Sequence, residues 1–464
     1  MMKKTVSFQL LIVNCLLLLA ACVPKSKPAG EEEAVTPVLL SSAPAANATV
    51  AATLQEATLV FGQKVAITNQ PKITLNGGSV AGATATDSAL TVRLGALEAT
   101  TAYTLSLAAG AIKAIPGVMN TEAITVAFRT AEAPPAPPLS PTLAVANPSP
   151  EAVKLYAFLK ENFGQKIISG AMANVSWNTN EAEWVHRHTG KYPALNGFDY
   201  IHLYASPSSW IDYGNTQVVE DWWSNNGIVT AMWHWNVPTA QGSSTYAFYT
   251  PKGGTPSTAF DISKAVQDGT YEHGVVTADL NAIANYLLLL KQKNIPVLWR
   301  PLHEAAGGWF WWGAKGATPL KALWRLMFET FEAKGLNNLI WVWTAEPNDD
   351  AWYPGDEYVD IVGRDIYGKP TAAAMAGEYA SLKTRFPSKM VTLSECGNVA
   401  SVAEQAAQGV RWSWFMPWYD YGRTSSSGGA AFSSTAHEHA NAAWWSSAFA
   451  DPRVLSRDEI EVKD

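Results

Sequence analysis

The chain has 464 residues, 48% of them apolar, and a formal net charge of -7 at pH 7. This length exceeds one ordinary domain and supplies enough apolar residues for a large core, so we expect two domains plus terminal segments. Charges of both signs are mixed along the sequence, without the basic stripe by which nucleic-acid-binding proteins displace counterions, so no nucleic-acid partner is expected.

Residues 1–21 have the features of an export signal. Lys3 and Lys4 precede an apolar run that is too short to span a membrane as a helix. The sequence Leu19–Ala20–Ala21–Cys22 resembles a bacterial lipobox, in which Cys22 becomes the lipidated first residue; a plain secretory signal is the alternative. We therefore expect an exported lipoprotein, held to the outer membrane through Cys22 on its periplasmic or its cell-surface face.

A polar tether follows over residues 22–36. Its acidic run Glu31–Glu32–Glu33 resembles the surface-export signal of some bacterial lipoproteins, or is a solvated linker. Of the three cysteines, Cys15 lies in the signal and Cys22 would carry the lipid. Only Cys396 remains, so no internal disulfide is expected.

Residues 37–132 alternate short β-favouring runs with Gly, Asn and Asp, which predicts a small antiparallel sandwich. The runs cover residues 58–61, 73–75, 90–94, 103–107 and 124–128. In pattern, this region resembles the bacterial Ig-like domains of surface proteins. The resemblance implies a spacer, with sugar binding as the alternative. A proline-rich, semi-rigid linker is expected over residues 133–147.

Residues 148–464 alternate apolar strands with helices, the pattern of a parallel α/β fold. Ser149 and Pro150 are typical of a helix start, and a second helix with a strong apolar stripe is expected from Thr318 to Lys334. The first helix is expected to bury Val153, among other apolar residues. Eight candidate strands lie at residues 166–170, 192–198, 228–233, 295–300, 339–343, 358–363, 390–394 and 410–416.

Eight strands are the number that closes a (β/α)8 TIM barrel. The competing open, doubly wound sheet would need a glycine-rich phosphate loop after the first strand, and Ile168–Ser169–Gly170–Ala171–Met172 is not such a loop. The predicted fold class is therefore α/β, a (β/α)8 barrel preceded by a small all-β sandwich.

Chemistry in such a barrel lies at the carboxyl ends of the strands. The fourth strand ends in Arg300–Pro301–Leu302–His303–Glu304, and the seventh ends in Ser394–Glu395–Cys396–Gly397. Glu304 and Glu395 are three β/α units apart, so we expect them to face one another across the barrel mouth. A tryptophan-dense loop, Trp309–Phe310–Trp311–Trp312, follows the first of them. Such tryptophans either pack in the core or stack on a flat, weakly polar ligand such as a sugar ring.

Two facing carboxylates suit hydrolysis of a glycosidic bond, which needs one acid to protonate the leaving oxygen and one carboxylate at the oxocarbenium-like centre. Glu304, beside Trp309 and Trp311, is expected to have the raised pKa. Glu395, with Tyr367 and Arg300 available as donors, is expected to be ionised. The alternative is that either glutamate only pairs with an arginine at the rim.

Other chemistries lack their motifs. His303–Glu304 begins like the zinc motif H-E-x-x-H, but the second histidine position is Gly307. The sequence His437–Glu438–His439 has a spacing that does not converge on a helix face, and we expect a solvated segment. Phosphate-loop, nucleotide and Ser–His–Asp signatures are missing from the sequence. No metal or cofactor is expected.

From residue 148 onward the sequence resembles glycoside hydrolase family 26, best known for retaining endo-β-1,4-mannanases. The motifs that carry the resemblance are Arg300 to Glu304 with Trp309 to Gly313, Asp365–Ile366–Tyr367–Gly368, and Ser394 to Gly397. The resemblance implies an acid/base at Glu304 and a nucleophile at Glu395. It implies substrate-binding roles for His303, Trp309, Tyr367, His234, Trp418, Arg300, Trp311 and Asp365.

Within this family resemblance, His234 and Trp418 would shape the subsite of the sugar under attack. The sequence departs from some family mannanases at Tyr419, where they have arginine, and at Ala305–Ala306–Gly307, where many have a bulkier polar residue. The expected enzyme is a monomeric glycoside hydrolase that cleaves β-mannan, galactomannan or glucomannan by double displacement. A β-1,3-xylanase, a mixed-linkage β-glucanase and a non-catalytic glycan-binding lipoprotein are the alternatives.

Overall fold

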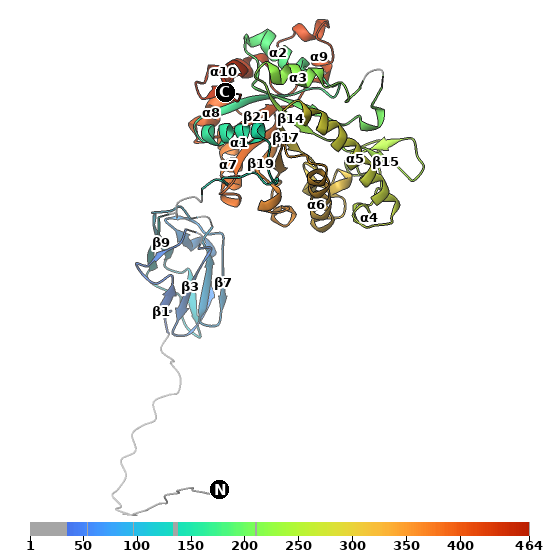
Figure 1. Cartoon of the computed structure of the whole chain (residues 1–464). Helices are drawn as coiled ribbons and strands as arrows, with labels where there is room; N and C mark the ends of the chain where they lie inside the picture. The colour runs from blue at the N-terminus through green and yellow to red at the C-terminus, as the bar shows by residue number, and fades with distance from the viewer. Residues whose placement is uncertain (1–34, 53, 96, 133–137, 209–210, 464) are drawn as a thin grey trace, which may run out of the picture. The chain divides into compact units, whose positions relative to one another are not determined.

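The computed structural model describes residues 35–52, 54–95, 97–132, 138–208 and 211–463, which form two compact units, Met1–Pro135 and Ala136–Asp464 (Figure 1). The predicted export signal, Cys22 and residues 22–34 of the tether lie outside the described residues. Within these described ranges, no helix combines the length and apolar character needed to cross a membrane.

The first unit is all-β, as the sequence predicts. A four-stranded sheet has the order β1-β3-β8-β7, and a five-stranded sheet has the order β2-β11-β9-β5-β6, with β10 and β4 paired beside them. Alternate residues of β3 are buried, and these meet side chains of the other sheet in one apolar cluster. The strands are β1 (Leu39–Ala43), β2 (Thr49–Val50), β3 (Glu56–Phe61), β4 (Lys64–Ile67), β5 (Ile73–Leu75), β6 (Gly78–Ser79), β7 (Gly82–Thr86), β8 (Ala89–Arg93), β9 (Ala102–Leu107), β10 (Ile112–Ile115) and β11 (Ile124–Thr130).

The second unit is a closed parallel barrel, which confirms the predicted fold class. Its strand order is β13-β14-β17-β18-β19-β20-β21-β12, and β12 pairs with β13 to close the ring. The short strand β22 (Val454–Leu455) pairs in parallel with Ile167 and Ile168 at the start of β12. The barrel strands are β12 (Ile167–Met172), β13 (Leu195–Asp199), β14 (Ile228–Met232), β17 (Val297–Arg300), β18 (Leu339–Thr344), β19 (Ile361–Tyr367), β20 (Met390–Gly397) and β21 (Trp414–Pro417).

Helices pack around the outside of this barrel (Figure 1). They are α1 (Pro150–Asn162), α2 (Asn180–Thr189), α3 (Gln217–Ser224), α4 (Ile262–Ala265), α5 (Tyr271–Gln292), α6 (Ala317–Ala333), α7 (Ala372–Arg385), α8 (Val402–Ala407), α9 (Tyr421–Thr424) and α10 (Ala442–Ala450). The α1 start is confirmed, because the Ala152 N–H donates to the Ser149 side chain. The expected burial of Val153 is wrong, since α1 leaves this side chain 47% exposed.

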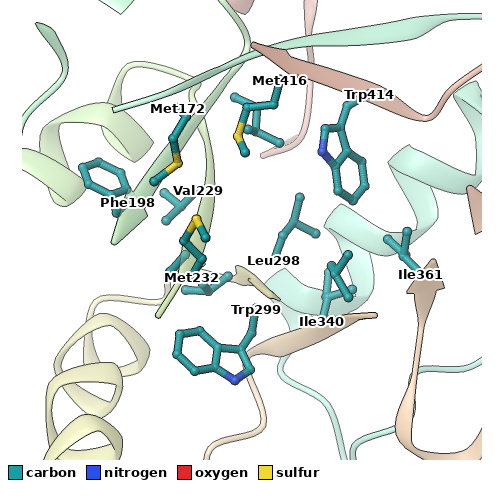
Figure 2. Packing of buried hydrophobic residues seen from close by; sticks show 14 of the residues in the cluster. Met172, Phe198, Val229, Met232, Leu298, Trp299, Ile340, Ile361, Trp414 and Met416 are labelled. Carbon is teal, nitrogen blue, oxygen red and sulfur yellow. The ribbon is translucent and has the colours of Figure 1, made fainter. Parts of the chain in front are cut away.

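The barrel interior is filled by side chains, which leaves chemistry to the rim. Figure 2 shows Met172, Met416, Met232 and Leu298 directed from different strands towards a shared space. Gly197 makes room for them, since a Cβ atom there would lie 2.6 Å from the Met172 Sδ. The barrel is thus a packed core and not a pore.

The second half of the segment predicted as a linker packs on the barrel. Leu143 and Val145 belong to the apolar cluster of the second unit, and the Ala144 N–H donates to Asp360 Oδ1 at 2.6 Å. Residues 138–147 are therefore part of the barrel unit.

Candidate active site

Glu304 lies just beyond β17, in a tight turn at the barrel mouth. Leu302 and Glu304 both have left-handed backbone angles, φ 51° and φ 52°, which non-glycine residues seldom adopt. The turn leaves the Glu304 carboxylate partly exposed, and the Trp309 Nε1–H donates to its Oε2 at 2.9 Å. The first predicted catalytic residue is thus held at the rim by the first tryptophan of the loop that follows it.

Glu395 lies in β20 and receives a hydrogen bond on each carboxylate oxygen. Arg300 Nη2 donates to Oε1, and the Tyr367 hydroxyl donates to Oε2 at 2.8 Å. Arg300 also binds Asp365 Oδ2 at 3.0 Å, and the Ser394 hydroxyl donates to Asp365 Oδ1 at 2.8 Å. A register shift between β19 and β20 places Asp365 opposite Glu395.

The two glutamates face one another, as the sequence predicts. One carboxylate oxygen from each of Glu304, Asp365 and Glu395 lies within 4.8 Å of the other two. This spacing matches the shorter class of glycosidase carboxyl pairs, about 5 to 5.5 Å, in which one group acts as a nucleophile. The Arg300 guanidinium binds two of these three carboxylates and supplies the positive charge that a cation would otherwise bring.

Burial and neighbouring charge separate the two pKa values. Burial, together with the charges of Asp365 and Glu395, raises the pKa of Glu304 to about 9. Burial and Asp365 also raise the pKa of Glu395, but only to about 7, because Arg300 opposes them by charge and by its hydrogen bond. The pair therefore keeps its proton on Glu304 and its negative charge on Glu395.

One wall of the site is built from histidine and tryptophan. Asp199 accepts hydrogen bonds from the His234 backbone N–H at 3.0 Å and from its Nδ1 at 2.5 Å, which fixes the ring. The rings of Trp418 and His303 approach this histidine at 5.9 Å and 4.6 Å between centroids. Burial, His234 and Arg300 lower the pKa of His303 well below its ordinary value, so this histidine is neutral.

A long insertion after β14 packs against the loop that carries Trp309. The Thr250 N–H donates to the Trp309 carbonyl at 2.7 Å, and Lys252 Nζ donates to the Gly307 carbonyl at 2.8 Å. The approach is close enough to require Gly253, because a Cβ atom there would lie 2.3 Å from the Trp309 carbonyl oxygen. The insertion therefore fixes the position of the tryptophan that binds Glu304.

Three of the predicted substrate-binding residues are buried away from any ligand. Trp311 is fully buried, and its Nε1–H donates to the Trp235 carbonyl at 2.7 Å. The Arg300 and Asp365 side chains, 2% and 0% exposed, bind each other and hold Glu395. Their burial and their protein partners indicate that these three side chains build the site and do not line its surface.

The expected solvated segment at His437 is also wrong. The His437 and Glu181 side chains are 1% and 4% exposed and lie 3.0 Å apart, so they form a buried pair behind the rim. The His439 ring packs edge-on against Tyr367, at 5.7 Å between centroids.

Two carboxylates at the barrel mouth, Asp199 and Glu346, were not predicted from the sequence. Asp199 is the last residue of β13, one position beyond the predicted strand, and Glu346 lies two residues beyond β18. The same rule that found Glu304 and Glu395, a carboxylate at the carboxyl end of a barrel strand, would have found both.

The Glycosyl hydrolase family 26 model matches residues 144–442. A mannan endo-1,4-beta-mannosidase of Thermothelomyces thermophilus is 37% identical over 288 residues, 59% of this chain and 56% of that protein. The mannan endo-1,4-beta-mannosidase A of Piromyces sp is 34% identical over 289 residues, 60% of this chain and 46% of that protein. This chain thus spans about half the length of these curated relatives.

Solved structures give the same match to the barrel. The GH26 domain of an endo-beta-mannanase/endo-beta-glucanase from Prevotella bryantii is 38% identical, with a TM-score of 0.62 over 70% of this chain and 100% of that chain. A beta-mannanase from a symbiotic protist of the termite Reticulitermes speratus, solved with a gluco-manno-oligosaccharide, is 35% identical, with a TM-score of 0.61 over 70% of this chain and 98% of that chain.

Proposed function

This chain belongs to glycosyl hydrolase family 26, and from that membership we propose that it is a retaining endo-β-1,4-mannanase that cleaves β-mannan, galactomannan or glucomannan. The observation that carries the proposal is the facing pair Glu304 and Glu395, with oxygens within 4.8 Å and unequal pKa values. The relatives described above, named as mannan endo-1,4-beta-mannosidases, support β-mannan as the substrate class.

The proposed reaction is a double displacement. Ionised Glu395 attacks the anomeric carbon while protonated Glu304 gives its proton to the departing glycosidic oxygen, which leaves a covalent glycosyl-enzyme. Glu304, now ionised, takes a proton from water, and that water releases the sugar with retained configuration. Arg300 and Tyr367 hold the attacking oxygens of Glu395 in place through the reaction.

Substrate contact is proposed for the residues that remain accessible beside the pair. Trp309 and Trp418 are partly exposed, and Tyr367 is 41% exposed, so each can present a ring or hydroxyl to a sugar. His234 is 8% exposed and is oriented by Asp199, so it is proposed to present its other ring nitrogen to the same sugar, while neutral His303, which is 1% exposed, packs against His234.

The first experiment measures reducing-sugar release by the soluble form that starts after Cys22. The substrates are linear β-1,4-mannan, galactomannan, β-1,3-xylan and mixed-linkage β-glucan, and the Glu395→Gln variant is the blank. We expect the wild-type protein to cleave both mannans and the Glu395→Gln variant to cleave neither. Cleavage of only the xylan or the β-glucan would change the assigned substrate to that polymer. No cleavage of any of the four polymers would favour a glycan-binding protein.

For the amino-terminal part we propose an Ig-like spacer behind a lipid anchor at Cys22, which holds a monomeric enzyme at the outer membrane. The lipobox-like sequence before Cys22 and the separate all-β core of the first unit support this arrangement. In cells fed labelled palmitate, the full chain should take up label in the membrane fraction. A Cys22→Ala variant that still carried label would contradict the anchor.

A further inference from the structure

Glu346 lies at the barrel mouth, two residues beyond β18. In the barrel order β18 stands between β17 and β19, so Glu346 lies between the strand ends that carry Glu304 and Asp365. It is half-buried. The inference below rests on the proposed function, because it assigns this residue a role at the same barrel mouth.

The backbone of Glu346 is fixed on both sides. Its N–H donates to Asp349 Oδ2 at 2.7 Å, and its carbonyl accepts from Arg385 Nη1 at 2.9 Å. Arg385 in turn forms ion pairs with Asp349 and Asp350. The position of Glu346 is thus set by Asp349 and Asp350 of its own loop and by Arg385 of α7.

The carboxylate of Glu346, in contrast, forms neither a hydrogen bond nor an ion pair with any residue in the ranges that the structure describes. Burial of a carboxylate without donors costs free energy, which donors from a bound ligand would offset. Burial and Asp365 raise the pKa of Glu346 to about 7, and Arg364 opposes them. The charged groups around it are Glu304, Arg364, Asp365, Asp349 and Glu378.

The barrel order also says which half of a substrate would reach Glu346. A line from Glu304 to Glu395 divides the mouth, with β18 and β19 on one side and the other strands on the opposite side. His234 and Trp418, which follow β14 and β21, stand on that opposite side, where the proposed mechanism places the sugar under attack. The sugar that departs must then cover the ends of β18 and β19.

We propose that Glu346 binds the departing half of the substrate by accepting hydrogen bonds from hydroxyl groups of the sugar whose glycosidic oxygen Glu304 protonates. Sugar hydroxyls are neutral donors, and a carboxylate is an acceptor with four lone-pair sites, so the bonds formed are charge-assisted. A fixed backbone with a free carboxylate suits this role, because the backbone needs no further ordering on binding and the carboxylate oxygens have no protein partner to give up.

The test compares three substrates that share the attacked sugars and differ in what departs. In mannopentaose the leaving group is a sugar, and its oxygen must be protonated as it departs. In phenyl β-mannobioside the leaving group is phenol, which also needs a proton but is not a sugar. In 4-nitrophenyl β-mannobioside the leaving group is 4-nitrophenol, which departs with little need of a proton. For Glu346→Ala we expect kcat/KM to fall about 10- to 100-fold on mannopentaose. On the two aryl mannobiosides kcat/KM should stay within about twofold of wild type. These substrates have no departing sugar for Glu346 to bind, and the variant binds their attacked sugars as wild type does, so the activation barrier is unchanged.

Glu346→Gln keeps the size of the side chain. Its kcat/KM should also fall most on mannopentaose, but by less than in Glu346→Ala. Glu357→Ala is the control, since Glu357 is an exposed glutamate of the same β18–β19 connection, and it should match wild type on all three substrates. A melting temperature for each variant shows whether it folds.

Three results would overturn the inference. Equal losses on all three substrates by both Glu346 variants would make the residue structural. Losses on mannopentaose and the phenyl mannobioside together would mean that Glu346 acts only by tuning Glu304. Unchanged rates throughout would leave it without a role. Wild type inactive on every mannoside would instead refute the proposed function, and this inference with it.

Discussion

The two glutamates illustrate how identical side chains acquire different tasks from their neighbours. Glu304 has one neutral donor, the Trp309 indole, and three carboxylates that repel its charge. Glu395 has a buried arginine and a tyrosine hydroxyl, both of which favour the ionised form. Charge and hydrogen bonding therefore assign the proton to Glu304, although both groups lie in the same desolvated mouth.

Substitution of each glutamate should therefore have a different signature. Glu395→Gln should abolish turnover of every mannoside, while Glu304→Gln should lose about 10²- to 10⁴-fold on mannan and much less on 4-nitrophenyl β-mannobioside. Added azide should restore turnover of this aryl substrate in Glu304→Gln, with a β-configured glycosyl azide as product. The measurement is initial rate with NMR of the azide. An α-configured glycosyl azide from Glu304→Gln would mean that Glu304 is the nucleophile and Glu395 the acid/base.

Loss of the Tyr367 hydroxyl should move the pH profile in a known direction. Tyr367→Phe removes a hydrogen bond to ionised Glu395, so the pKa of Glu395 rises and the acid limb of kcat/KM moves to higher pH. A hydrogen bond to a charged group corresponds to a shift of about 1 to 2 pH units. The basic limb, which reports Glu304, should move much less.

Tyr421→Phe, at a tyrosine that is 56% exposed, is the matched control and should leave both limbs in place. An acid limb that moved to lower pH in Tyr367→Phe would mean that this hydroxyl favours the protonated form of Glu395 instead.

The insertion between β14 and α5 holds the loop of Trp309, and through this tryptophan it holds Glu304. It hydrogen-bonds to the loop of Trp309 through Thr250 and Lys252, although these residues are more than fifty positions away in the sequence. Its closest approach occurs at Gly253, which packs against the Trp309 carbonyl and the Tyr249 ring. The geometry of Glu304 thus depends on a segment outside its own strand.

A methyl group at Gly253 should separate the insertion from the tryptophan loop. In Gly253→Ala the new Cβ would overlap the Trp309 carbonyl oxygen, so one of the two loops must shift. Because a displacement of about 1 Å at a catalytic group can cost about 10²-fold, we expect kcat on mannan to fall about 10- to 100-fold. Gly428→Ala, with open space around it, is the control. Normal kcat in Gly253→Ala would show that the insertion does not position Trp309.

The two units of the molecule have separate apolar cores. The barrel core includes Leu143 and Val145, so the catalytic unit begins before residue 148, and all residues of the candidate site lie within it.

A fragment of residues 138–464 should therefore fold and keep the kcat/KM of the soluble full chain on mannopentaose, to within about twofold. A fragment that starts at residue 148 should be less stable, because it loses two buried side chains, each of which stabilises by about 1.5 to 3 kcal/mol. Thermal unfolding and initial rates check both. Failure of the longer fragment to fold would show that the units depend on each other.

The sequence by itself determined the barrel and the facing pair of glutamates at its mouth. Strands buried on both faces appear as continuous apolar runs, and the polar residue that ends such a run must lie at the mouth. Because Glu304 and Glu395 end strands that are three β/α units apart, they lie opposite each other at this mouth. Asp199 and Glu346 follow the same rule, since Asp199 ends β13 and Glu346 lies two residues beyond β18.

Only the tertiary structure decided which loop side chains face the cleft. The left-handed turn at Leu302 and Glu304 and the insertion around Gly253 direct Trp309 to the carboxylate and bury Trp311. Likewise, Glu181 buries His437 across a large sequence separation. Loop side-chain directions follow from single backbone angles and from contacts between distant segments, and neither is encoded in a local apolar pattern.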